Sequence, residues 1–336
     1  MERISKRNYL ILILSTLILL IFVFFAAIFI GKYVIKPECF FDALFNSSTQ
    51  FTTERSVILN LRLPRTIIAL LTGIGLSVSG LIYQDIFQNK LVSPDFLGVS
   101  SGASIGACVA ILLGLGSVWI CAFSFIFAII AMVLTLIVSK IFKNTSPVVL
   151  LLSGIIVSEM MDSGIGLIKY LADTDNQLGE ITNWLLGTFS KTTMNDVYVM
   201  APIVIIIVSI IFVIRWRINV IALGRNEANS RGLNYKLYLI VLIILITLLT
   251  ASSVAFCGIV GWVGLVIPHI SRLIVGRNTQ RSIPFTCILG GLFMIICDIL
   301  SRSFTFSEIP LSVVTGFLGT PIFVIVLATK GRGIHD

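Results

Sequence analysis

The chain has 336 residues, of which 57% are hydrophobic and only 12% are charged. Soluble proteins carry about 25% charged residues, so a water-soluble enzyme, a disordered tail and a nucleic-acid-binding domain are excluded as the main interpretation. The remaining class is an all-α polytopic membrane protein, for which the net charge of +8 matters through the side of the membrane on which it falls.

The first predicted element is a retained transmembrane helix over residues 8–31. Basic residues precede its apolar run, which covers residues 10–30. A secretory signal has a shorter apolar region of roughly 7–15 residues, followed by a cleavage site of small residues. The run is longer than that, and residues 31–33 (GKY) make a poor cleavage site.

Further apolar runs of about 20 residues predict additional spans along the chain. The stretch 237–270 carries no charge over about 34 residues, which is too long for one span, so we expect a tight turn near residues 256–258 to divide it. The ten predicted spans are 8–31, 64–84, 95–113, 118–139, 147–169, 197–214, 237–256, 257–275, 283–301 and 309–328.

The charges of the loops orient these ten spans. With the N-terminus inside, 16 of the 24 Lys and Arg residues fall on the inner side and 8 on the outer side. This asymmetry agrees with the positive-inside rule. We therefore expect both termini in the cytoplasm and a single transmembrane domain over residues 1–336, with no separate soluble domain.

Two arginines stand directly before the second span, on the side predicted to be outside. Arg62 and Arg65 flank Pro64, and proline suits the first turn of a helix. The helix would hold both guanidinium groups at the outer rim. Lipid phosphates and the carboxylates of an acidic partner could each bind them there, so the residues alone leave anchoring and docking open.

Small residues mark the third span. Gly98, Gly102 and Gly106 recur at every fourth position, a pattern that lets another helix approach closely. Tight packing inside one subunit is the simpler interpretation, and a role in helix movement is the alternative.

Acidic residues inside spans are costly and often functional. Glu159 and Asp162 lie three positions apart in the fifth span and so share one face of a helix. They either line a water-filled pathway, pair with polar groups of a neighbouring helix, or reach solvent near the outer end. In the ninth span Asp298 precedes Arg302 by four positions, which predicts an intrahelical ion pair.

Several motifs are absent from the sequence. It contains no G-x-x-x-x-G-K-[ST] phosphate loop, no H-E-x-x-H motif and no nucleophile elbow, and only two histidines. Six cysteines without a C-x-x-C spacing predict neither a disulfide framework nor a metal site. We expect no cofactor and no hydrolysis of ATP by this chain, so active transport would draw on an ion gradient or on a partner.

The motifs together resemble one family over nearly the whole chain, from about residue 57 to 332. The chain resembles permease subunits of the FecCD type, which belong to ATP-binding-cassette importers for iron–siderophore complexes, haem and vitamin B12. The matching blocks, in order, are 61–65 (LRLPR), 80–84 with Asn89, 97–103 (LGVSSGA), 184–187 (WLLG), 222–224 with Ala228 and 231–233, Gly261 with 263–270 and Arg272, Asp298 with Arg302, 308–310 (EIP), 315–316 and 319–321 (GTP).

The resemblance implies ten helices and a defined set of partners. These are a second permease, either a copy or a homologue, two cytoplasmic ATPase subunits, and an extracytoplasmic substrate-binding protein, with lipid around the bundle and no nucleic acid. In the family, outer arginines pair with acidic residues of the binding protein. The matching positions are Arg62, Arg65 and Arg302.

The resemblance also assigns roles inside and below the membrane. A short cytoplasmic segment seats in the ATPase and transmits its closure, and here it corresponds to residues about 219–235. Its motif residues are Leu223, Gly224, Ala228, Arg231 and Gly232. Family pathways run between the two permeases and are lined largely by the fifth and tenth spans, which favours a pathway role for Glu159 and Asp162.

We therefore expect the membrane-spanning subunit of an ATP-driven importer in the bacterial plasma (inner) membrane, carrying an iron–siderophore complex and catalysing no covalent step. Haem, cobalamin and molybdate are alternative cargoes within the family. From another class, a proton-coupled secondary transporter would use Glu159 or Asp162 as its proton site. Such folds often contain inverted repeats, and no convincing repeat is visible in this sequence.

Overall fold

The computed structural model describes residues 5–33, 52–142, 146–276, 278–304 and 307–331. Within these ranges every regular element is helical. The helices are α1 (Lys6–Phe29), α3 (Thr52–Ser56), a π-helical segment (Val57–Arg62), α4 (Leu63–Ile86), a 3-10 turn (Pro94–Leu97), α5 (Val99–Leu112), α6 (Ser117–Ile141), α7 (Pro147–Leu171), α8 (Gln177–Leu185), α9 (Met194–Ile221), α10 (Arg225–Ser230), α11 (Tyr235–Cys257), α12 (Val263–Val275), α13 (Thr279–Ser303) and α14 (Leu311–Gly331).

The all-α membrane fold is confirmed, and each of the ten predicted spans coincides with a helix. Among the described residues, seven helices are long and apolar enough to cross a membrane, and α5, α12 and Leu311–Val326 of α14 are shorter apolar helices. The 14 residues of α5 and the 13 of α12 reach only about 20 Å. The predicted spans 95–113 and 257–275 were therefore too long, because turns occupy the first part of each.

The predicted turn after the seventh span is confirmed. Helix α11 ends at Cys257, and Gly258 follows with φ +74°. This left-handed conformation is open to glycine at little cost. The next helix starts only at Val263, after Trp262, which also has a positive φ of 70°.

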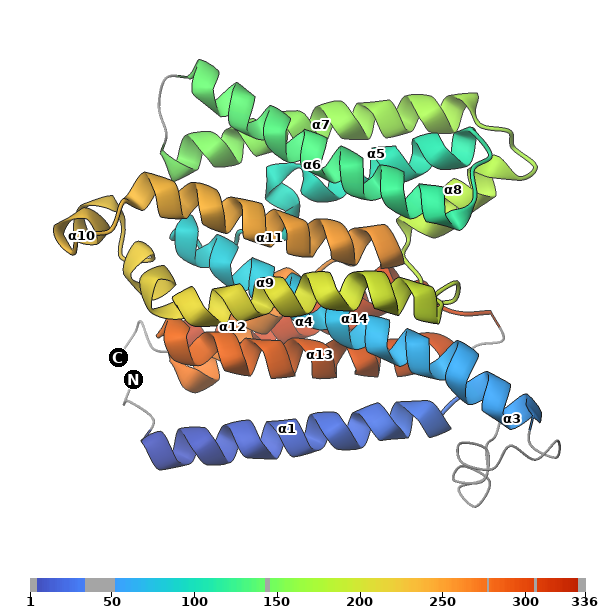
Figure 1. Cartoon of the computed structure of the whole chain (residues 1–336), viewed down its shortest axis with the longest axis horizontal. Helices are drawn as coiled ribbons and strands as arrows, with labels where there is room; N and C mark the ends of the chain where they lie inside the picture. Colours follow the sequence, from blue (N-terminus) through green and yellow to red (C-terminus); the bar gives the residue numbers. More distant parts are fainter. Residues whose placement is uncertain (1–4, 34–51, 143–145, 277, 305–306, 332–336) are drawn as a thin grey trace.

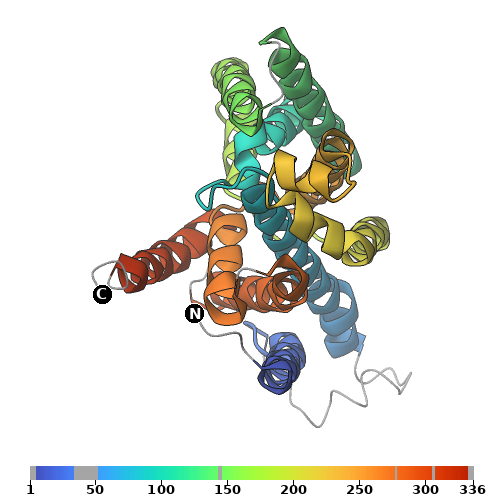
Figure 2. The same ribbon diagram turned by 90° about the vertical axis from the view of Figure 1, so that its left-hand side faces the viewer.

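Helix α4 runs through the centre of the bundle (Figures 1 and 2) and packs against α9, α11, α12 and α13. Of its most apolar stretch, 83% is buried, against 11% for the peripheral α1. Helices α5, α6 and α7 form one side of the molecule, and α14 projects away from the other side (Figure 2).

Glycines bring the central helices into backbone contact. A Cβ atom added at Gly73 would lie 2.2 Å from the carbonyl oxygen of Gly290, and one at Gly80 would lie 1.8 Å from that of Gly264. No side chain fits at either crossing. Close approach of this kind gives membrane helices their packing energy, since water does not drive their association.

The predicted packing glycines divide into two kinds. A Cβ atom at Gly102 would lie 2.4 Å from that of Ala131, and one at Gly106 would lie 2.4 Å from the carbonyl oxygen of Phe123, so both face α6 of the same chain. Gly98 instead starts α5 with φ +75°. Glycine is required at position 98 because the backbone there is left-handed.

The loops separate into two ends. The tip of α10 and the start of α1 lie at one end, which we name the inner end (Figure 1). The start of α13 joins them, since the hydroxyl of Tyr9 donates to the carbonyl of Arg281 at 3.0 Å. Helices α3 and α8 lie at the opposite, outer end. The assignment of the inner end to the cytoplasm stays a prediction from loop charge.

Candidate functional site

Charged side chains gather at the outer end, where the sequence predicts a docking surface. Arg62 ends the π-helical segment, Arg65 follows in the first turn of α4, and Arg302 lies in the last turn of α13. Their exposed fractions are only 5%, 7% and 6%. All three guanidinium groups therefore find their partners within the chain.

Arg65 lies between two carboxylates. Its Nε is 2.6 Å from Oδ1 of Asp298, and its Nη1 is 2.6 Å from Oε1 of Glu308. Asp298 is completely buried. The predicted intrahelical pair with Arg302 is also present, with Nε 3.4 Å from Oδ2 of Asp298, so this one acid holds two arginines in place.

Arg62 and Arg302 hold the end of α1 in place. Arg62 donates from Nη1 to the carbonyl oxygens of Ile28 at 2.6 Å and Phe29 at 2.8 Å, and from Nη2 to that of Tyr33. Arg302 donates from Nη2 to the carbonyl of Ala27 at 2.6 Å. The last carbonyls of a helix lack intrahelical partners, and cations are favoured there. The arginines thus cap the C-terminal end of α1.

In this conformation none of the three arginines predicted to dock a binding protein exposes its guanidinium group. The sequence predicted arginines on an exposed rim. It could not show that Arg62 and Arg302 donate hydrogen bonds to carbonyl groups at the end of α1. Docking through Arg62, Arg65 and Arg302 requires some of these internal contacts to be exchanged. That role stays a prediction.

A cavity of about 870 Å³ opens beside this cluster at the outer end. It lies between the starts of α6 and α9, helix α8 and residues 308–310. Glu180, Lys191, Asp196 and Glu308 are among its polar lining residues, and Trp184 and Phe256 among its apolar ones. The cavity is within the size range of ligand pockets. Sequence reasoning found the block around Trp184 but no cavity.

The predicted coupling segment, residues 219–235, forms the end of α9, the short helix α10 and the turn into α11. Gly224 and Gly232 border α10 with φ of +102° and +75°, which explains why glycine stands at both turns. Leu223 and Arg231 are exposed, whereas Ala228 is fully buried and anchors the helix. The segment thus exposes most of α10, while Ala228 and the buried residues at its two ends, Val220, Ile221 and Tyr235, hold it to the bundle.

The predicted pathway residues lie in the middle of α7. Glu159 is twelve residues from each end of the helix Pro147–Leu171, or about 18 Å. Glu159 and Asp162 are both exposed, and among the residues that the structure describes neither carboxylate has an ion pair. A carboxylate facing lipid at this depth is expensive, so this face of α7 needs water or a further subunit beside it.

Comparison with known proteins decides the family. The FecCD transport family matches residues 19–329. The chain belongs to this family. This FecCD permease is 31% identical over 311 residues to the molybdate import system permease protein MolB of Haemophilus influenzae, covering 91% of this chain and 92% of that one. It is also 31% identical over 334 residues to the Fe(3+)-citrate import system permease protein YfmE of Bacillus subtilis, covering 98% of each.

A solved structure has the same fold as this FecCD permease. It is described as an inward-facing conformation of an ABC transporter of metal-chelate type, with a TM-score of 0.86, 30% identity, and coverage of 94% of this chain and 98% of that one. The chain is therefore a multi-span ABC importer permease of the bacterial inner membrane. The alternative of a proton-coupled secondary transporter is set aside.

Proposed function

We propose that this chain is the membrane-spanning subunit of a binding-protein-dependent importer for an iron–siderophore complex. The family match over residues 19–329 carries the part of the proposal that concerns an importer permease, and the likeness to a metal-chelate transporter supports an iron chelate as the cargo. A second permease, two ATPase subunits and an extracytoplasmic binding protein complete the assembly. ATP hydrolysis belongs to the ATPase subunits, and this chain supplies the passage.

The exposed face of α7 favours some cargoes over others. Glu159 and Asp162 would be repeated in a second copy, so four carboxylates would face the passage between the permeases. Fixed charge of one sign concentrates opposite charge and repels its own. A cationic or hydrogen-bond-donating chelate suits this lining, and a small oxyanion does not. Molybdate is retained as the second candidate because the relative MolB is named for it.

Cargo identity is testable by uptake into proteoliposomes that contain the complete assembly. We expect ATP-dependent accumulation of radiolabelled iron presented as a siderophore complex, and growth on that iron source in a strain lacking the whole cassette. The matched comparison is labelled molybdate. Uptake of molybdate alone would replace the proposed cargo, and uptake by the isolated chain without ATPase would refute an ATP-driven importer.

The docking role of the arginines has a test with a definite sign. Replacing Asp298 with Asn would release Arg65 and Arg302 from their shared acid. If these arginines dock carboxylates of the binding protein, the folded Asp298→Asn permease should capture that protein more tightly, and Arg302→Gln should capture it less tightly. Unchanged capture by both variants would limit the arginines to holding α1.

Coupling through residues 219–235 is tested at Gly224. Its φ of +102° disfavours any side chain, and a Cβ atom there would lie 2.9 Å from Nε2 of Gln88. We expect Gly224→Asp to leave the permease inserted and to separate ATP hydrolysis from uptake. Normal uptake per ATP hydrolysed would contradict the role of this segment.

A further inference from the structure

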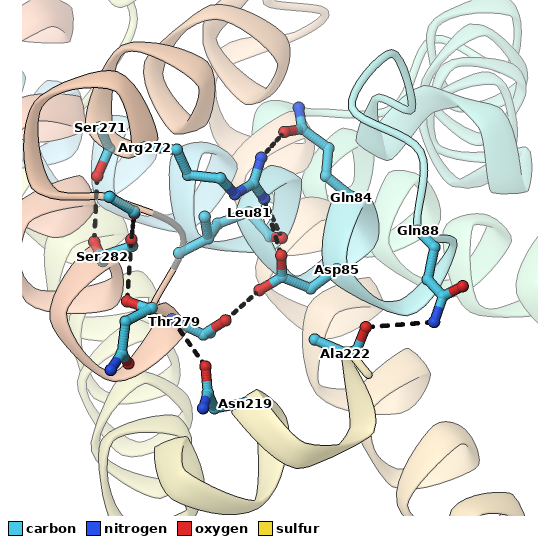
Figure 3. A network of polar contacts seen from close by, with 12 residues as sticks. Leu81, Gln84, Asp85, Gln88, Asn219, Ala222, Ser271, Arg272, Thr279 and Ser282 are labelled. Atoms are coloured by element: carbon cyan, nitrogen blue, oxygen red, sulfur yellow. Dashed lines mark hydrogen bonds and ion pairs between the residues drawn. The ribbon is translucent and has the colours of Figure 1, made fainter. Parts of the chain in front are cut away.

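One acid with little exposed surface lies where the dipole of its own helix disfavours a negative charge. Asp85 lies in the last turn of α4, near the negative end of that helix's dipole, and its side chain is only 12% exposed. The partners around it must therefore compensate both its burial and its position. We name this acid with Gln84, Gln88, Asn219, Arg272 and Thr279 the Asp85 network (Figure 3).

Asp85 joins α4 to two other helices. Its Oδ1 accepts from Nη2 of Arg272 at 3.1 Å, and its Oδ2 accepts from the hydroxyl of Thr279 at 2.8 Å (Figure 3). Arg272 stands in the last turn of α12, and Thr279 is the first residue of α13. The carboxylate is thus favourably placed for the positive N-terminal end of α13.

Arg272 holds α12 to α4 by further bonds. It donates from Nη1 to Oε1 of Gln84 and from Nη2 to the carbonyl of Leu81 at 3.0 Å. The amide of Gln84 in turn donates to the carbonyls of Gly264 at 3.4 Å and Leu265 at 3.3 Å. Both the first and the last turn of α12 are therefore hydrogen-bonded to α4, and the ion pair of Arg272 with Asp85 lies at the last turn.

The same network reaches the segment that carries α10. The backbone N–H of Thr279 donates to Oδ1 of Asn219, near the end of α9, at 3.1 Å. Gln88 donates from Nε2 to the carbonyl of Ala222 at 3.2 Å, two residues before Gly224. Figure 3 shows these contacts converging on the end of α4. Four helices, α4, α9, α12 and α13, meet here beside α10.

We propose that the Asp85 network carries displacement of α10 into the bundle, with Asp85 as the positioning residue that ties α12 and α13 to α4. The inference rests on the proposed function, since α10 moves only if an ATPase contacts it. Displacement of α10 would move the end of α9 through residues 222–224. The hydrogen bond between Asn219 and Thr279 would then move the start of α13. The charge of Asp85 keeps the three helix ends moving as one body.

The test separates coupling from stability. Asp85→Asn keeps the size of the side chain and an acceptor for Thr279, but removes the charge opposite Arg272. In proteoliposomes with the full assembly, we expect it to lower cargo imported per ATP hydrolysed by roughly 2- to 30-fold, the range seen for residues that carry coupling. A purely structural loss would reduce uptake and hydrolysis together and leave their ratio unchanged. Asp173→Asn, an exposed acid at the outer end, is the matched control.

Two further measurements keep the inference open to refutation. Thr279→Val removes one bond to Asp85 and keeps the shape of the side chain, so it replaces Asp85→Asn if that variant does not assemble. Thr279→Val should also lower the cargo imported per ATP hydrolysed. The double variant should lower this ratio by less than the product of the two single fold-changes. A wild-type ratio in either assembled variant would overturn the inference. Failure of the proposed function would instead appear in the wild-type assembly, as hydrolysis without cargo uptake.

Discussion

The buried pair of Arg65 and Asp298 permits a quantitative prediction of stability. Arg65→Gln would leave Asp298, which has no exposed surface, with Arg302 at 3.4 Å as its remaining ion-pair partner. Asp298→Asn would leave two neighbouring arginines with Glu308 alone. Each change removes one partner of a buried pair without removing the other, which is the costly case.

The structure sets the expected magnitude. Removing one partner of a buried ion pair costs about 3–5 kcal/mol. Arg65→Gln should fall at the lower end, about 3 kcal/mol, because Arg302 still compensates part of the charge of Asp298. The double variant removes both charges, so it should cost less than the sum of the single variants by about 2–3 kcal/mol, a coupling typical of groups in direct contact.

The measurement is the free energy of unfolding of the purified permease in mixed micelles, with increasing denaturing detergent, for the wild type, both single variants and the double variant. Glu308→Gln is the matched control. Its side chain is 31% exposed and can be hydrated, so we expect a cost of at most about 1 kcal/mol. Additive costs for the double variant, within about 0.5 kcal/mol, would refute a direct Arg65–Asp298 interaction.

Two further predictions concern helix packing and the attachment of α1. Gly80→Ala should abolish monodisperse permease in size-exclusion chromatography, because its Cβ atom would lie 1.8 Å from the carbonyl oxygen of Gly264. Gly116→Ala, which meets no atom within 4 Å, should be tolerated, and equal profiles would contradict the crossing. Arg62→Met should increase hydrogen exchange near the end of α1, since several carbonyls lose their donor. The exposed Arg55→Met should leave exchange unchanged, and protection in both variants would disprove the cap.

The sequence was sufficient for elements that depend on local patterns. Apolar runs located the ten spans, and Gly258 marked the division of the longest run. The same patterns extended α5 and α12 too far. Gly98 and Trp262 start these helices from left-handed conformations, and a Trp with positive φ leaves no compositional signal.

Tertiary pairings lay beyond sequence reasoning. The pair of Asp298 with Arg302 was predicted because four residues separate them on one helix. The shorter contact to Arg65 bridges 233 residues, and that between Arg272 and Asp85 bridges 187. Such contacts depend on how the helices cross at their glycines. Sequence alone therefore indicated charged ends of spans but not which charges meet.

The attachment of α1 also orders the assembly of the chain during synthesis. The carbonyl of Ala27 receives its hydrogen bond from Arg302, 275 residues later, and α13 is among the last helices to be made. Until then α1 is held by Arg62 and the start of α4, and it is stable in the bilayer because its backbone bonds are internal. Completion of the outer end therefore waits for nearly the whole chain. A ribosome stalled before α13 would hold an inserted first helix capped by Arg62 but lacking α13, the helix against which it mainly packs.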